Sequence, residues 1–495
     1  MRRMQRIAVT AAALILVPLS PALSAQAEPD VRGGLAEKLV RKVTIGAVHR
    51  HLIAFQRIAD RNGGNRADPS PGARESLDYV AERVRAAGFE VTIQEFGYDR
   101  RVIDAESLTV AATRVVPDHM TGSPQTPVGG LTAGLVVVPA DSTTGCEPED
   151  YTGIDVAGAI VLIRRGGCSF VTKERVAADA GAIAGVVYNN SPGPMGGEVN
   201  PATARIPMVG LVGVDGTALI ALAGKQATLD ARHHIEPTNS RNLIASTRTG
   251  RRDNAVIVGA HLDSLPAVPG INENATSVAA MLETALQLGG SPKVNNSVRF
   301  IWWGGDWDNT GSDAYLRSLS FEQQLDIALH IELEAIGSPN GGYFVFDGDG
   351  SSTGGSGPYG SGQIEQAFAD YYASRGIATE PTKFPGPGAY SDFMPAGIPT
   401  GGLFSGLFHT KTQAQAEKWG GTAGALFDPC NHSVCDNLGN INRDLLDKNA
   451  DAVAHITGRF ARSTRDVNGV ESRAHRASVR QAATRQAAGI SVVTE

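Results

Sequence analysis

Cysteine and aromatic residues are scarce in this sequence, and long apolar runs are lacking beyond its first 27 residues. Only 4 of the 495 residues are cysteine, and no Cys-x-x-Cys pair occurs, so a cysteine-bound metal is not indicated. Aromatic residues make up 6%. No arginine-rich face with interleaved aromatics is present, which argues against nucleic acid as a partner. The later apolar runs are too short to cross a bilayer, so no membrane span is predicted.

The first 27 residues are typical of a secretory signal. Three arginines precede an apolar stretch at 7–19, and Ala25-Gln26-Ala27 forms a small-x-small cleavage site. The apolar stretch is interrupted by Pro18 and is too short for a membrane anchor. Removal of residues 1–27 takes away three arginines and no acid, so the formal net charge changes from −7 to −10. The sequence therefore predicts a protein that is exported and secreted.

The stretch from Val256 to Glu283 combines a strand, a turn and a helix around polar residues. An apolar run at 256–258 predicts a buried strand that ends in Gly-Ala-His261-x-Asp263. A turn at Pro269-Gly270 and then Glu273 follow, before a helix that begins near residue 276. Open parallel sheets bind ligands at the carboxyl ends of their strands. We therefore expect His261 and Glu273 to lie close together, as metal ligands do in metal-dependent hydrolases.

Long motifs occur in this sequence in the order found in secreted bacterial zinc aminopeptidases that use two metal ions. They are Gly259-Ala-His-Leu-Asp-Ser264, Phe300-Ile-Trp-Trp-Gly304, Ile336-Gly-Ser-Pro-Asn340, Lys418-Trp-Gly-Gly-Thr-Ala-Gly424 and Phe427-Asp-Pro-Cys-Asn-His-Ser-Val-Cys-Asp436. The sequence resembles that family over most of its length. The resemblance implies an α/β fold with a mostly parallel central sheet and helices on both faces. It also implies zinc as the cofactor and removal of amino-terminal residues from peptides as the activity.

Residues 128–230 resemble a protease-associated domain that is inserted into the peptidase. The motifs that carry this resemblance are Gly145-Cys146, Val161-Leu-Ile-Arg-Arg-Gly-Gly-Cys-Ser-Phe170, Val187-Tyr-Asn-Asn190 and Ile206-Pro-Met-Val209. We expect a small β-rich α+β unit with short strands around one helix at about 173–180. Such domains act as lids or interaction surfaces and carry no chemistry themselves.

The peptidase domain is then discontinuous, at residues 35–127 and 231–462. Helical spacing of apolar residues predicts a helix between about 35 and 60, a second from Ala73 to Ala87, and a strand at 89–96. The last residues, 463–495, are rich in Arg, Ala and Ser and poor in large apolar groups, so a flexible tail is expected. The cysteines of an exported protein are expected to pair. Local pairing, Cys146 with Cys168 and Cys430 with Cys435, is what the resemblance also implies.

The family's metal ligands can be carried over to matching positions of this sequence. The first zinc then takes His261, Glu273 and Glu334, where Glu273 and Glu334 each stand in place of an aspartate. Asp263 would orient the imidazole of His261. After Trp302-Trp303-Gly304 the family has two glutamates, of which the first is the general base. That base position falls on Asp306 here.

The ligands of the second zinc do not carry over in the same way. The position of the second glutamate falls on Trp307, and the late histidine, expected after Asp392, is replaced by Phe393. Neither an indole nor a phenyl ring offers a lone pair to zinc. Three residues offer a possible rescue of this site: Asp308 by a slip of its loop, and His409 or His432 from nearby loops.

Three hypotheses follow for the function. The chain is a hydrolase with one zinc, a catalytically inactive homologue that binds peptides or a partner protein, or an ordinary two-zinc aminopeptidase that uses the rescue ligands. The sequence favours one zinc over two and also allows none. The expected partners are peptides or proteins. The oligomeric state and the residue specificity are not determined by the sequence.

Overall fold

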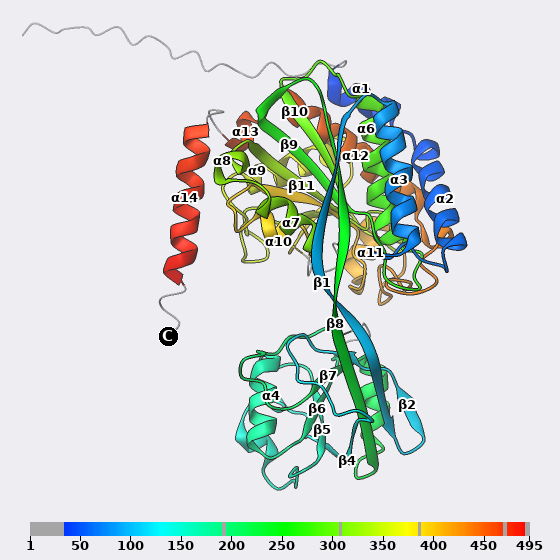
Figure 1. Ribbon diagram of the computed structural model, residues 1–495, viewed down its shortest axis with the longest axis vertical. Coiled ribbons are helices and arrows are strands. Elements are labelled where there is room, and N and C mark those ends of the chain that lie inside the picture. The colour runs from blue at the N-terminus through cyan, green and yellow to red at the C-terminus, as the bar shows by residue number, and fades with distance from the viewer. Residues whose placement is uncertain (1–33, 191–194, 306–308, 385–387, 469–472, 491–495) are drawn as a thin grey trace, which may run out of the picture. The chain divides into compact units, whose positions relative to one another are not determined.

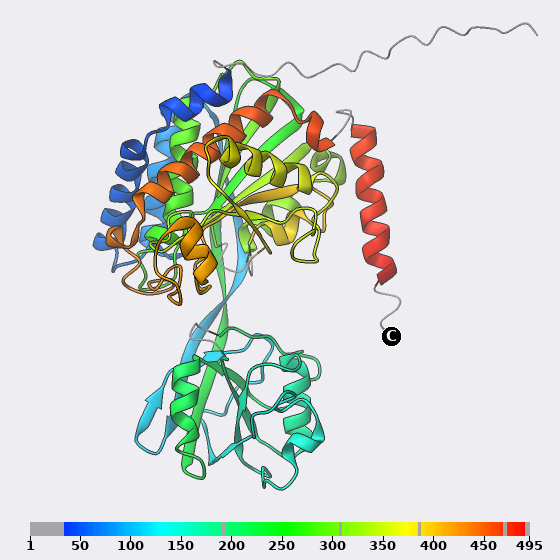
Figure 2. The same ribbon diagram turned by 180° about the vertical axis from the view of Figure 1, so that it is seen from behind.

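The computed structural model describes residues 34–190, 195–305, 309–384, 388–468 and 473–490. The predicted signal segment, residues 1–27, lies outside these ranges, as do Asp306, Trp307 and Asp308. Figures 1 and 2 show the described elements from two opposite sides. None of the described helices is both long and apolar enough to cross a membrane.

The peptidase domain is built on a sheet whose central strands are parallel. Its strand order is β13-β12-β14-β11-β9-β10-β8. The neighbours β14, β11, β9 and β10 are parallel, whereas β12 is antiparallel to β14 and β8 is antiparallel to β10. The strands span β8 (Gln226–Ser246), β9 (Arg251–His261), β10 (Asn296–Trp303), β11 (Ile327–Glu334), β12 (Phe344–Phe346), β13 (Glu380–Thr382) and β14 (Thr400–Phe404). The mostly parallel sheet expected from the resemblance is confirmed.

Helices cover both faces of this sheet, as the sequence predicts (Figure 1). Alternate residues of a strand point to opposite faces. Val256 and Val258 of β9 therefore join the larger apolar core, and Ile257 joins a smaller one on the other face. The larger core receives side chains from α1 (Leu35–Lys42), α2 (Ile45–Arg61), α3 (Pro71–Ala86), α6 (Ser277–Leu288), α9 (Ser361–Ser374) and α12 (Arg443–Arg462). The smaller core receives them from α7 (Thr310–Arg317) and α10 (Tyr390–Phe393). Two further short helices are α8 (Phe321–Gln324) and α11 (Gln413–Trp419).

The first predicted helix is interrupted at Val43 and Thr44, so the structure has two helices where the sequence pattern predicted one. The Thr44 hydroxyl accepts a hydrogen bond from the backbone N–H of Ala47 and caps α2. Side chains of this kind satisfy the unpaired donors at a helix start. Apolar spacing alone does not detect the break, because both helices bury residues at nearly the same period.

Two strands of 21 residues each, β1 (Glu90–Val110) and β8, connect the two domains. They pair as an antiparallel ribbon, and β2 (Thr113–Val115) pairs with the end of β1. The strand predicted at 89–96 is thus much longer than expected. Leu108 and Val110 already pack in the core of the inserted domain. Its packing therefore begins within β1, ahead of the predicted start at residue 128.

The inserted domain has a parallel sheet of four strands rather than a few strands around one helix. These are β4 (Leu131–Val137), β5 (Ile160–Arg164), β6 (Ala184–Tyr188) and β7 (Met208–Leu211), with β3 (Asp118–His119) antiparallel to β7. The predicted helix is α4 (Phe170–Asp179), and a second helix, α5 (Gly213–Ile220), was missed. Ser169 caps α4. The sequence of α5 is short and weakly amphipathic, so its apolar spacing did not predict a helix.

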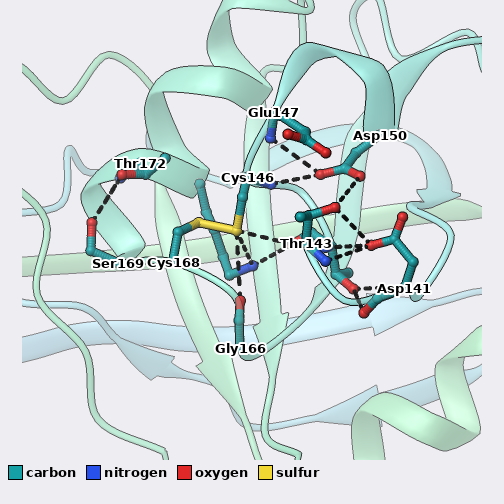
Figure 3. Close-up of a disulfide and its surroundings, with 11 residues drawn as sticks. Asp141, Thr143, Cys146, Glu147, Asp150, Gly166, Cys168, Ser169 and Thr172 are labelled. Carbon is teal, nitrogen blue, oxygen red and sulfur yellow. Dashed lines mark hydrogen bonds between the residues drawn. A yellow bond between two sulfur atoms is a disulfide. The ribbon is translucent and has the colours of Figure 1, made fainter.

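Both predicted disulfides are present, Cys146–Cys168 and Cys430–Cys435. Figure 3 shows the first of them beside Asp150. The Asp150 carboxylate accepts hydrogen bonds from the backbone N–H groups of Cys146 and Glu147, at 2.8 and 3.2 Å. The disulfide and this carboxylate together fix the loop between β4 and β5.

The carboxyl-terminal segment differs from the flexible tail that the composition suggested. It contains α13 (Arg465–Asn468) and α14 (Arg473–Ile490). Arg476 and Arg480 of α14 are buried and donate to main-chain carbonyls, Arg476 to Leu325 and Arg480 to Ile327. The composition argument counts only apolar burial. Here guanidinium groups donate hydrogen bonds to backbone carbonyls near the start of β11. A count of apolar residues does not detect such contacts.

Candidate metal centre

Three of the predicted ligands, His261, Glu273 and Glu334, come together at the carboxyl edge of the parallel strands. His261 is the last residue of β9, and Glu334 is the last residue of the neighbouring strand β11. Glu273 lies in the segment Ile271–Thr276, directly before α6, where its own backbone is non-helical, with φ −110° and ψ 96°. One ligand atom from each residue lies within 4.8 Å of those of the other two. The Nε2 atom of His261 is 3.5 Å from Oε1 of Glu334.

The imidazole of His261 is oriented by Asp263, mainly through the main chain. Nδ1 lies 3.1 Å from the carbonyl oxygen of Asp263 and 3.7 Å from its carboxylate. A carbonyl only accepts, so Nδ1 carries a hydrogen and donates it. The other nitrogen, Nε2, is then directed toward Glu334. Asp263 therefore contacts His261 chiefly through its carbonyl oxygen, which is nearer than its carboxylate.

His432 reaches this group from the loop that the Cys430–Cys435 disulfide closes. Its Nε2 atom is 3.0 Å from Oε2 of Glu273. The same loop ends at Asp436, whose carboxylate accepts hydrogen bonds from the backbone N–H groups of Asn272 and Glu273, at 2.7 and 3.1 Å. Asp436 thereby fixes the position of Glu273. Of the three rescue residues named above, His432 is the one that the described structure places at Glu273.

Phe393 and His409, two other residues considered for the second metal, lie in apolar surroundings. Phe393 is fully buried in the smaller core, where its ring stacks on that of His330 with the centroids 4.0 Å apart. His409 lies against the rings of Phe404 and Phe408. His432 is the late residue that the fold brings to Glu273, whereas Phe393 lies within the smaller apolar core. Asp306, Trp307 and Asp308 lie outside the described residues.

The centre has an excess of buried acid. Burial raises the pKa of Glu334, and the neighbouring Glu273 raises it further. Burial also raises the pKa of Asp436, to about 7, with Asp428 and Glu273 adding to the effect. Burial lowers the pKa of His261, but the carboxylates of Glu334 and Asp263 outweigh it and hold that pKa well above its ordinary value. A divalent cation among these donors would relieve the repulsion between the carboxylates, so the residues fit a bound metal.

A buried arginine that sequence reasoning missed holds the loop between His261 and Glu273. Arg66 is fully buried, and burial lowers its pKa to about 10. Its guanidinium donates to the carbonyls of Leu262, Pro269 and Gly270. Its own backbone N–H donates to the hydroxyl of Ser264. Arg66 follows the Gly63-Gly64-Asn65 break, and nothing in its local sequence distinguishes it from a surface arginine.

Two hollows adjoin the centre. A small one of about 10 Å³ is lined by His261, Asp263, Glu273, His432 and Asp436, among others. Asp263 also lines a larger cleft of about 480 Å³. This cleft is lined by acidic and basic residues, including Asp68, Arg74, Glu95 and Arg241. It reaches Gly304 at the end of the Trp-Trp-Gly motif.

The family can now be identified from comparison with known proteins. The profile described as peptidase family M28 matches residues 242–457, and the PA domain profile matches residues 131–219. The chain is 40% identical over 467 residues to the probable lipoprotein aminopeptidase LpqL of Mycobacterium tuberculosis, which covers 92% of this chain and 93% of that protein. The chain belongs to peptidase family M28.

Two other similar proteins agree with this assignment. An aminopeptidase of Pseudomonas aeruginosa is 38% identical over 450 residues, covering 87% of this chain and 83% of that one. Among solved structures, a zinc aminopeptidase from Bacillus subtilis superposes with a TM-score of 0.64 at 24% identity, covering 85% of this chain and 96% of that chain. At that identity the superposition shows the fold. The M28 chain described here thus combines the peptidase fold with an inserted PA domain.

We predict that replacing Arg66 with lysine weakens zinc binding by this M28 chain about 10- to 100-fold, because the loop between His261 and Glu273 loses its planar clamp. The free energy of unfolding should fall by about 2 kcal/mol. Arg57→Lys, on the exposed face of α2, is the matched control and should change neither quantity. Titration of zinc against a competing chelator measures the affinity. Unchanged affinity in a destabilised Arg66→Lys protein would show that Arg66 supports only the fold.

Proposed function

We propose that this M28 chain is an exported zinc aminopeptidase that removes amino-terminal residues from peptides. The observation that carries the proposal is the meeting of His261, Glu273 and Glu334 with His432 at a single buried edge of the sheet. Imidazole and carboxylate are donors that zinc accepts. The names of the relatives, aminopeptidase in P. aeruginosa and zinc aminopeptidase in B. subtilis, support the same activity.

We propose two zinc positions that share Glu273. One is held by His261, Glu273 and Glu334, and the other by Glu273 and His432 with a further donor from residues 306–308. The argument from sequence for a single ion rested in part on Phe393 as the late position. The contact of His432 with Glu273 at 3.0 Å supports His432 in that role instead. A carboxylate shared by two ions about 3.5–4 Å apart is the arrangement used by two-metal hydrolases.

The residues of the chain have distinct roles in this proposal. Zinc supplies Lewis acidity, which polarises the scissile carbonyl and lowers the pKa of water to about 7. Asp263 orients His261 through its carbonyl, and Asp436 fixes Glu273 by accepting from the backbone N–H groups of Asn272 and Glu273. The excess of carboxylates would attract the ammonium group at the start of a peptide. Asp306 is proposed as the general base. The cleft beside Asp263 is large enough for peptide side chains.

We also propose that residues 1–27 are removed on export and that residues 128–230 act as a lid or interaction surface. The two disulfides support an oxidising compartment. The M. tuberculosis relative, named as a lipoprotein, supports export. We expect protein recovered from the medium of an exporting bacterial host to begin at Glu28, as intact-mass and amino-terminal analysis would measure. A secreted chain that still carried residue 1 would contradict the cleavage site.

The second zinc position is tested by changing His432. We expect wild-type protein to bind two zinc ions per chain by native mass spectrometry and to hydrolyse a leucine anilide. His432→Ala should bind one ion fewer and lose about 100-fold or more in kcat/KM, because a metal contributes several kcal/mol to transition-state stabilisation. Phe393→Leu is the control and should lower stability while retaining both ions. No zinc and no turnover in the wild type would instead favour a binding protein on a peptidase scaffold.

The roles of Asp306 and Asp308 are separable by the same two measurements. Asp306→Asn should lower kcat about 100-fold or more with zinc stoichiometry unchanged, because a general base is lost while the ligands remain. Asp308→Asn should lower the zinc content, because Asp308 is the carboxylate proposed to complete the second site. The reverse result would exchange the proposed roles of Asp306 and Asp308.

A further inference from the structure

A second group of carboxylates lies at the opposite edge of the sheet from the candidate metal centre. It consists of Asp347, Asp349 and Glu365, and one oxygen from each lies within 4.8 Å of those of the other two. Asp347 directly follows β12, which runs antiparallel to β14. Because β14 is parallel to β11, which ends at Glu334, the end of β12 lies at the edge where those strands begin. The group is therefore separate from the proposed zinc positions.

One oxygen of this group is buried without a hydrogen bond. Asp347 is 0% exposed. Its Oδ2 atom accepts from the backbone N–H groups of Ser352 and Thr353, at 3.1 and 2.6 Å. Its Oδ1 atom has no hydrogen-bond partner within the described part of the chain. A buried carboxylate oxygen without a hydrogen-bond partner destabilises the folded state, and a bound cation is one means of providing that partner.

The other two carboxylates are also held by the main chain. Glu365, near the start of α9, accepts through Oε2 from the backbone N–H groups of Gly348 and Asp349, at 2.8 and 3.4 Å. Asp349 accepts through Oδ1 from the N–H of Ser351 at 2.8 Å. One oxygen of each of the three side chains therefore accepts hydrogen bonds from the backbone of the loop.

Within the described ranges, no positive side chain balances these three acids. Among the described residues, neither lysine nor arginine forms an ion pair with Asp347, Asp349 or Glu365. Burial raises the pKa of Glu365, and Asp349 and Asp347 raise it further. Three carboxylates whose oxygens lie close together without a counter-charge repel one another. A divalent cation bound between them would relieve this repulsion.

The chemistry of the group selects the cation. All donors are oxygens, so zinc, which prefers nitrogen and sulfur, is disfavoured relative to hard cations. The sequence Asp347-Gly-Asp349-Gly-Ser351 places oxygen-bearing side chains at alternate positions of a glycine-rich loop. This spacing is typical of calcium-binding loops, which add a carboxylate from a following helix. Magnesium retains most of its water and seldom takes several protein carboxylates.

We propose that Asp347, Asp349 and Glu365 form a calcium-binding site that is independent of the zinc centre. The ion joins the end of β12, the loop at 347–353 and the start of α9. Asp349 is exposed, which leaves room for water to complete the coordination. The site is structural, because it lies at the edge of the sheet away from the peptidase chemistry. It stabilises the packing of α9 on the outer strands.

The test uses full-length protein that is kept saturated with zinc and treated with a calcium-selective chelator. Equilibrium dialysis against calcium should give one bound ion per chain, with Kd on the order of 0.1–1 mM as in extracellular calcium modules. At a calcium concentration about 100 times Kd, the Tm should rise by about 2–4 °C. Hydrolysis of the leucine anilide at 25 °C should not depend on calcium.

Variants distinguish this site from any other calcium-binding group. Asp349→Asn and Glu365→Gln should each abolish the bound ion and the rise in Tm. Asp370→Asn removes an equal charge at an exposed position of α9 and should keep both. Calcium binding that persists in Asp349→Asn and Glu365→Gln would overturn the proposal, as would a wild-type protein that binds no calcium at 10 times the upper Kd given above.

Discussion

The Asp436 carboxylate, with its hydrogen bonds to the backbone of Asn272 and Glu273, is the contact on which the candidate centre depends. It joins a loop near the end of the chain to the segment before α6, 163 residues earlier for Glu273. The same loop contains His432, which contacts Glu273. Glu273 and the residue that approaches it are therefore positioned by one closed unit, the loop that the Cys430–Cys435 disulfide completes.

The remaining ligands are positioned by the sheet. His261 and Glu334 end two adjacent parallel strands, so their separation follows from strand pairing and needs no further support. The loop from His261 to Glu273 is different, because it has no regular structure to hold it. Arg66 supplies that support through three carbonyls. A planar guanidinium suits this role because its several donors are fixed in one plane.

Buried polar groups, rather than additional apolar packing, organise several parts of this molecule. Arg66, Asp436 and Asp428 surround the candidate centre, and Asn272 joins two of them by donating to Asp428 and to Asp436. Arg476 and Arg480 attach α14 in a comparable way. Groups of this kind are strongly stabilising only when every member has its partner. They are also the features that a pattern of apolar residues does not reveal.

The sequence by itself determined the strand that ends in His261, the segment of Glu273, and both disulfides, because each depends on a local pattern or a long motif. It also indicated the PA domain, whose profile matches residues 131–219. Only the tertiary structure decided which late residue meets Glu273. Phe393 and His432 both follow plausible motifs, and their distance from Glu273 depends on how α10 and the disulfide loop fold back onto the sheet. The three acids beyond β12 were likewise unseen, because Glu365 is distant from Asp347 along the chain and adjacent only in the fold.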